Sequence, residues 1–190
     1  EEIKPWDYGF WSEKLKKARY DLDDELLKPY FEVGKCLDGV FAVASKLYDI
    51  KFKERKDIPL YHEDVRTYEV QTNDGKHVGV FYSDLFARAS KQNGAWMTTY
   101  RGQYRTKDRD VRPHVSIVCN FTKPAENRPS LLTFNELTTL FHEFGHALHA
   151  LLSECKYESL SGANVSWDFV ELPSQIFEYW AYEKECLDTF

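Results

Sequence analysis

Residues Phe141–His149 read FHEFGHALH and contain the motif H-E-x-x-H. If this stretch is helical, His142 and His146 lie four residues apart and project from one face of the helix, one turn from each other. Two imidazoles in this arrangement can bind the same zinc ion. Glu143 is offset around the helix, so it can reach a water on the metal rather than the metal itself, as a general base must. The motif therefore predicts a zinc site with a base beside it.

The residues around this motif follow the pattern of a buried helix. Thr133 and Glu136 have the spacing of a capping box, which predicts the N-terminus. Apolar residues then recur at helical spacing on both sides of the motif: Leu137, Leu140, Phe141, Phe144, Ala147, Leu148, Leu151 and Leu152. This stripe argues against the alternative of a solvated surface helix with two histidines. Gly145 is unusual in a helix interior, where glycine costs about 1 kcal/mol relative to alanine, and we expect it to mark close packing near the metal.

A third ligand would distinguish a catalytic zinc site from two unrelated histidines. Metzincins require H-E-x-x-H-x-x-G-x-x-H, but this chain has His149 at the glycine position and Leu152 at the third histidine, which excludes that class. Other zinc sites take a glutamate from a following helix, and Glu171 lies 25 residues beyond His146. We therefore expect Glu171 to be the third ligand.

The segment after the motif can bring Glu171 back to the histidines. Residues 159–166, SLSGANVS, are loop-like and can reverse the chain. We expect a helix from about Trp167 to Glu185 to follow and to pack antiparallel to the first. Gln175 and Glu178 follow Glu171 by four and seven residues, so they share its face and are candidates to orient the ligands. The alternative for these two residues is a solvated polar face.

With these motifs in place, the chain resembles the thimet oligopeptidase family of zinc peptidases. The resemblance rests on HEFGHALH followed by DFVELPSQ, and the upstream segments KPWDYGFW, DLDDELLKPYFE, GAWM and CNFTKPAENRPSLLTF are similar to its bacterial dipeptidyl carboxypeptidase branch. It implies that His142, His146 and Glu171 bind one Zn²⁺ per chain and that Glu143 is the catalytic residue. It also implies a zincin-like catalytic region within a longer helical peptidase, with the groups that stabilise the oxyanion outside these residues.

The apolar periodicity predicts a mostly α structure with a small β-sheet, which is an α+β fold. We expect one catalytic region over residues 1–190, with a helical segment at about 1–56, a small sheet at about 62–121 and the zinc-site helices at about 133–190. Alternation on both sides of Asn73-Asp74-Gly75 predicts a β-hairpin. By resemblance, Gly94–Trp96 is expected at an edge of the sheet that pairs with an extended peptide, and an ordinary loop is the alternative.

Composition excludes several classes of protein. The net charge is −6 with both signs interspersed, which argues against a nucleic-acid interface. No run approaches the ~18 consecutive apolar residues that a membrane-spanning helix needs. The four cysteines form no C-x-x-C pair, so we expect free thiols in a reducing compartment and a cytoplasmic protein.

Three functions are compatible with these patterns. We expect a zinc metallopeptidase that hydrolyses short peptides, releases C-terminal dipeptides and uses Glu143 to activate the zinc-bound water. An endo-acting oligopeptidase of the same family is the nearest alternative. A non-catalytic, zinc-stabilised binding module is the alternative of another class, although a structural zinc site has no need of a base at position 143. The sequence identifies neither the substrate-binding residues nor the oligomeric state.

Overall fold

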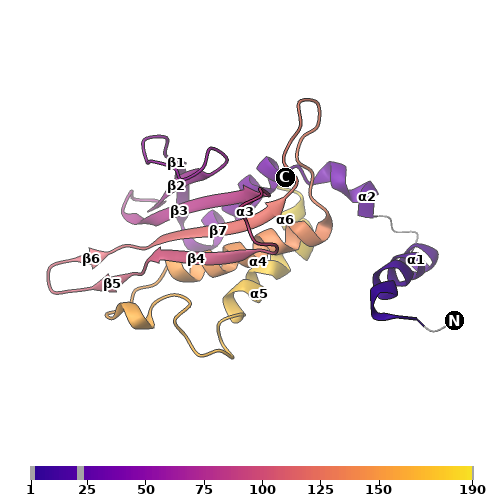
Figure 1. The fold of residues 1–190 in the computed structure, drawn as a ribbon. Helices are drawn as coiled ribbons and strands as arrows, with labels where there is room; N and C mark the ends of the chain where they lie inside the picture. Colours follow the sequence, from indigo (N-terminus) through magenta and orange to yellow (C-terminus); the bar gives the residue numbers. More distant parts are fainter. Residues whose placement is uncertain (1–2, 21–23, 190) are drawn as a thin grey trace.

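A mixed five-stranded sheet organises the structure, a computed structural model that describes residues 3–20 and 24–189 (Figure 1). Its strands are β1 (Ile50–Glu54), β2 (Arg66–Thr72), β3 (His77–Phe86), β4 (Trp96–Arg101) and β7 (His114–Phe121). Their order across the sheet is β1-β2-β3-β7-β4, so β1 and β4 form the two edges. Only the central pair, β3 and β7, is parallel; the other pairs are antiparallel.

Helices account for most of the remaining regular structure. They are α1 (Tyr8–Tyr20), α2 (Asp24–Leu27), α3 (Val33–Tyr48), α4 (Phe134–Leu151), α5 (Leu172–Glu178) and α6 (Lys184–Leu187). Short 3-10 turns are η1 (Pro5–Asp7), η2 (Lys28–Tyr30), η3 (Glu158–Leu160) and η4 (Tyr179–Tyr182), and β5 (Tyr104–Arg105) and β6 (Asp110–Val111) form a small ribbon. The combination of helices and one main sheet confirms the expected α+β class.

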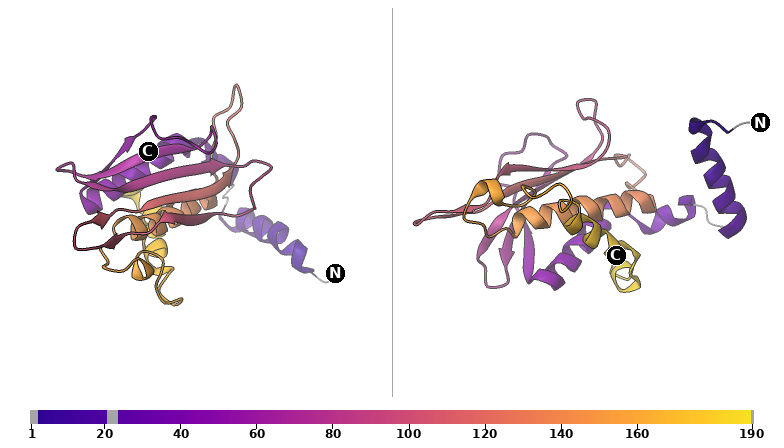
Figure 2. Two further views of the ribbon diagram at one scale, coloured as in Figure 1. Left: turned by 60° about the vertical axis from the view of Figure 1, so that its left-hand side comes forward. Right: turned by 90° about the horizontal axis from the view of Figure 1, so that it is seen from below.

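The helices α3, α4 and α5 lie on one side of the sheet (Figure 2). Aromatic rings join the two layers: Phe144 of α4 lies 5.2 Å from Phe81 of β3 and 5.7 Å from Phe41 of α3, measured between ring centroids. On its other side Phe144 lies 5.6 Å from Phe177 of α5. Helix α4 is therefore held between the sheet and α5, and its apolar stripe is buried as expected.

The predicted hairpin is confirmed. β2 pairs antiparallel with β3 through the turn at residues 73–75, where Gly75 has φ +90°, a value that glycine adopts readily. The edge expected at Gly94–Trp96 forms only from Trp96 onward, where β4 begins and pairs with β7 at the end of the strand order. Gly94 and Ala95 lie in the connection before it.

Two expectations were wrong. Residues 50–54, placed in the helical segment 1–56, form strand β1, because Ile50 and Phe52 alternate with lysines and Phe52 stacks on Phe41 at 4.2 Å. The helix expected from Trp167 to Glu185 is broken into α5, η4 and α6. Its start moves to Leu172 because Pro173 cannot donate a backbone hydrogen bond inside a helix but fits the first turn.

The described residues contain neither a disulfide nor a membrane-spanning helix. Cys36, Cys119, Cys155 and Cys186 are free thiols, as the sequence indicated. Within residues 3–20 and 24–189, no helix is long and apolar enough to cross a membrane.

Candidate metal centre

Helix α4 carries the two histidines, and its own sequence fixes where it starts. The Thr133 hydroxyl accepts a hydrogen bond from the Glu136 amide at 3.1 Å, and the Glu136 carboxylate accepts one from the Thr133 amide at 2.8 Å. This is the capping box predicted from the sequence. From this start, burial of the apolar stripe directs His142 and His146 away from the sheet side of the helix. Their ring centroids lie 5.0 Å apart.

The structure brings the three expected metal ligands together. Nε2 of His142 and Nε2 of His146 lie 3.1 Å and 3.0 Å from the same oxygen, Oε2 of Glu171. One ligand atom from each residue lies within 4.8 Å of the other two. Tetrahedral zinc with bonds of about 2.0–2.1 Å separates its ligands by about 3.3 Å, so only small side-chain movements are needed to admit the ion.

Glu171 reaches the histidines because α4 and α5 approach each other unusually closely. A Cβ added at Gly145 would lie 2.7 Å from Cα of Ser174 and 2.8 Å from the Pro173 carbonyl oxygen, so only glycine fits there. The close packing predicted at Gly145 is confirmed, and its partner is the backbone of α5. Glu171 directly precedes α5, where the Ser174 hydroxyl donates to its Oε2 at 2.9 Å.

Sequence reasoning did not anticipate Ser174. Its side chain is fully buried, and its hydroxyl also lies 2.8 Å from the Glu171 carbonyl oxygen. The signal was present as the pair Glu171 and Ser174, three residues apart on either side of Pro173. A hydroxyl three residues after a carboxylate in a first helical turn can bond to it and fix its rotamer.

Of the two residues expected to orient the ligands, the structure places one at the site. Oε2 of Glu178 lies 3.1 Å from Nδ1 of His142, so the carboxylate fixes the ring orientation and directs Nε2 towards Glu171. Among the described residues the Gln175 side chain forms no hydrogen bond with the ligands, and it lines a cleft with Glu178, Tyr179 and Tyr182. His149 contacts Phe169 instead and lies outside the ligand group.

The ionisation of the ligands suits a divalent cation. Burial lowers the pKa of His146, which favours the neutral imidazole that metals bind. Burial alone would raise the pKa of Glu171, but the Ser174 hydrogen bond and the neighbouring imidazoles lower it overall, so this carboxylate is charged. Nδ1 of His146 is buried and has no hydrogen-bond partner among the described residues.

Glu143 differs from the ligands in both position and environment. It is 7% exposed and is not a member of the ligand group. Its charge adds to the increase in pKa that burial causes at the thiol of Cys119 in β7. Burial raises the pKa of Glu143 to about 7, near the value at which a carboxyl can both accept and return a proton.

Comparisons with known proteins match the chain to a family of peptidases. The profile of peptidase family M3 matches residues 1–190. The chain is 48% identical to dipeptidyl carboxypeptidase of Escherichia coli over 94% of its own length and 26% of that protein. It is 44% identical to oligopeptidase A of the same organism over 98% of its length and 28% of that protein, and 38% identical to a thimet-like oligopeptidase of Dictyostelium discoideum. The chain thus spans about a quarter of the length of these relatives.

Proposed function

We propose that this chain, which belongs to peptidase family M3, forms the zinc centre of a metallopeptidase that hydrolyses short peptides. The observation that carries the proposal is the convergence of His142, His146 and Glu171 beside an unpaired, buried Glu143. Three protein ligands leave a fourth position open, which is typical of catalytic rather than structural zinc. Membership of peptidase family M3 supports a metal at this position, and the His₂Glu ligand set favours zinc, one ion per chain.

Each residue has a defined part in the proposed reaction. His142, His146 and Glu171 hold the ion, and Glu178 keeps the His142 ring in the orientation that binding requires. When bound, zinc polarises the attacking water and the scissile carbonyl. Glu143 accepts the proton of the water as the water attacks and then passes it to the leaving amine nitrogen.

The sheet edge offers a place for the substrate backbone. β4 packs against α4 and has a free edge, so an extended peptide can add to it as a further strand beside the metal helix. In this arrangement backbone hydrogen bonds hold the peptide irrespective of its sequence, which suits a peptidase of broad specificity. We assign substrate binding to this edge as part of the proposal, within a zincin-like catalytic region of a cytoplasmic enzyme.

Two modes of cleavage remain to be distinguished. The similarity to dipeptidyl carboxypeptidase favours release of C-terminal dipeptides, and the similarity to oligopeptidase A favours internal cleavage. We prefer dipeptide release, because the upstream segments resemble that branch.

Two fluorogenic peptides that differ only in a free or amidated C-terminus test this preference on the full-length protein. Cleavage of the free peptide alone, two residues from its end, supports dipeptide release. Equal cleavage of both peptides makes the enzyme an endo-acting oligopeptidase. Failure to cleave either peptide with zinc bound at one equivalent contradicts the proposed peptidase activity.

A further inference from the structure

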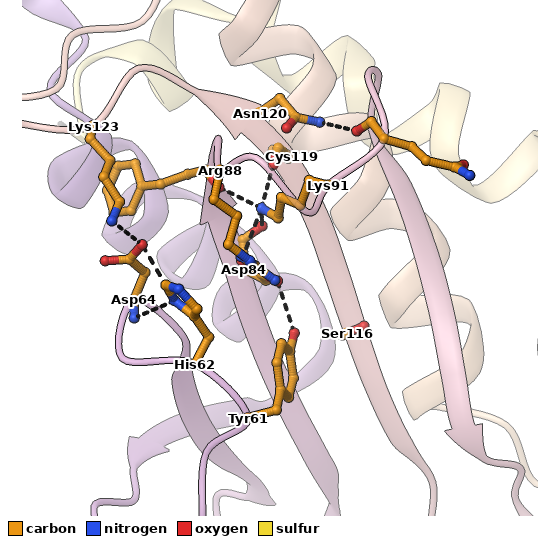
Figure 3. Close-up of polar contacts among 12 residues, drawn as sticks. Tyr61, His62, Asp64, Asp84, Arg88, Lys91, Ser116, Cys119, Asn120 and Lys123 are labelled. Carbon is orange, nitrogen blue, oxygen red and sulfur yellow. Dashed lines mark hydrogen bonds and ion pairs between the residues drawn. The ribbon is translucent and has the colours of Figure 1, made fainter.

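The connection from β3 to β4, residues 87–95, is held to the sheet by polar side chains (Figure 3). It leads directly into the free edge strand β4, which begins at Trp96. Two residues make most of these bonds: Lys91 within the connection and Asn120 on β7. Neither belongs to the metal centre.

Lys91 occupies an irregularity between the two parallel strands. Asp84 pairs with Val118 and Phe86 with Phe121, so two steps along β3 correspond to three along β7. Such a bulge leaves backbone groups without ladder partners. The Lys91 ammonium donates to the carbonyl oxygens of Phe86 at 2.7 Å and Cys119 at 2.6 Å, and thereby satisfies carbonyls of both strands.

The charge of Lys91 is neutralised inside the protein. Its side chain is 3% exposed, and Nζ lies 2.9 Å from Oδ1 of Asp84. Arg88 donates to both oxygens of that carboxylate, at 2.7 Å and 2.8 Å, and the Tyr61 hydroxyl donates to it at 3.1 Å. Lys91 is therefore held by one carboxylate and by backbone carbonyls from two strands, which restricts it to one position.

Asn120 extends this set of bonds to the first residues of the edge strand. Its Nδ2 donates to the carbonyl oxygens of Gln92 at 2.7 Å and Gly94 at 2.8 Å. Gly94 has φ +98°, so the chain turns sharply there before entering β4. The first β4 pair, Trp96 with Val118, lies next to the bulge. The bulge, the connection and the start of β4 thus form one bonded unit.

We infer that Lys91 and Asn120 are positioning residues that set where the free edge of β4 lies relative to α4, and thereby set the affinity for the peptide backbone. The inference rests on the proposed function, because it assumes that a peptide substrate adds to this edge. Buried ion pairs contribute little net stability compared with apolar residues, and their better-supported use is to specify one geometry. A bulge beside an active-site helix is also a recurrent means of directing a strand.

Two substitutions in the full-length, zinc-loaded protein test the inference. Lys91→Met removes the three donors and keeps a similar length, while Arg88 still neutralises Asp84. Asn120→Asp keeps the shape of the side chain and removes both donors to the connection. We expect each to raise KM for a peptide of six or more residues about tenfold and to change kcat less than about twofold, since edge pairing holds substrate and transition state alike.

Zinc content and amide hydrogen exchange complete the test. In both variants zinc should stay at one equivalent per chain. Amide hydrogen exchange at residues 96–101 should be faster than in wild type. It should also be faster than in the control Lys107→Met, which changes an exposed lysine in the loop between β5 and β6. Unchanged KM in both folded variants overturns the inference, and so does a parallel loss of zinc and kcat, which would mean general destabilisation. If wild type hydrolyses no peptide, the proposed function fails; exchange at β4 still shows whether Lys91 and Asn120 hold the strand.

Discussion

Among the described residues, Glu143 and Asp84 carry buried carboxyl groups whose pKa values are shifted in opposite directions. Glu143 is 7% exposed, and burial raises its pKa to about 7. Asp84 is 1% exposed, and burial acts on it in the same direction, but hydrogen bonds from Arg88, Lys91 and Tyr61 outweigh the effect and lower its pKa overall. The degree of burial therefore does not determine ionisation; the number of donors around the carboxylate does.

The difference separates a reactive group from a structural one. Asp84 has bonds to two cations and a hydroxyl, so its proton affinity is low and its geometry is fixed. Among the described residues no hydrogen-bond donor stabilises the Glu143 carboxylate, and its nearest charged influences are His142 and Glu171. Because no hydrogen bond from these residues stabilises its charged form, the Glu143 carboxylate beside the metal ligands can still accept a proton, as a general base must.

The largest expected effect comes from neutralising Glu143. Glu143→Gln keeps the shape of the side chain but cannot accept the proton of the attacking water, so kcat for a fluorogenic peptide should fall by about 10²–10⁴-fold. Zinc should remain at one equivalent per chain, because Glu143 is not in the ligand group. Turnover and metal analysis on the same preparation measure both quantities.

Glu171→Ala provides the contrast within the same centre. It removes a ligand rather than a base, so activity should be lost together with zinc. If Glu143→Gln retained wild-type turnover, Glu143 would not be the general base, and its difference from Asp84 would not bear on catalysis. If Glu143→Gln lost zinc as Glu171→Ala does, Glu143 would have to be assigned as a ligand.

The next effect concerns the carboxylate that orients a ligand. Glu178→Gln replaces the charged partner of His142 Nδ1, and such changes typically lower metal affinity or activity about 10–100-fold. Competition with a chelator of known affinity measures the change. Gln175→Ala is the matched control on the same helix. The Gln175 side chain is exposed and has no hydrogen bond to the ligands among the described residues, so this change should leave zinc affinity unchanged. Equal losses in both variants would indicate damage to α5 instead of a role for Glu178.

The candidate metal centre could be predicted from the sequence because the residues that form it lie close together in the chain. The capping box, the apolar stripe and the spacing of His142 and His146 lie within one helix, and Glu171 requires only one chain reversal. Even there, the break in the expected helix 167–185 was missed, although Pro173 is a local signal for it.

The environment of Asp84 could not be predicted in the same way. Its side-chain partners come from a loop before β2 and from the connection after β3. Lys91 binds there because a bulge exposes carbonyls of β3 and β7 to its ammonium group. No periodicity marks a bulge between parallel strands that are separated by the whole of β4.

A third prediction uses the contact between helices on which the metal centre depends. Gly145→Ala raises helix propensity, but its Cβ would lie 2.7–2.9 Å from atoms of Ser174, Pro173 and Phe177, two of them backbone atoms. We expect a loss of about 2 kcal/mol in the free energy of unfolding and weaker zinc binding, because α5 must move away with Glu171. Denaturant unfolding of the metal-free protein and chelator competition measure the two effects.

Gly9→Ala in α1 is the control for helix propensity. No atom lies within 4 Å of a Cβ added at Gly9, so the same substitution there should be neutral or stabilising by up to about 1 kcal/mol. Zinc affinity should not change. A Gly145→Ala variant as stable as wild type, with unchanged zinc binding, would show that α4 and α5 can separate without affecting the ligands.

The smallest effect tests the donors around Asp84. Tyr61→Phe removes one of three donors and leaves both cations, so we expect a loss of about 1 kcal/mol at neutral pH. The folded-state pKa of Asp84 lies below the unfolded value of about 3.9, so its stabilising contribution is present above that pH and is lost as the pH falls through the folded value. With one donor fewer, the folded-state pKa of Asp84 should rise towards the unfolded value.

The difference in stability between Tyr61→Phe and wild type should therefore be constant near neutral pH and shrink below about pH 4. The control Tyr30→Phe changes an exposed tyrosine and should show no difference from wild type at any pH. A difference that persists unchanged at low pH would mean that the Tyr61 hydroxyl stabilises the fold independently of the Asp84 charge, and the contrast with Glu143 would then rest on Arg88 and Lys91 alone.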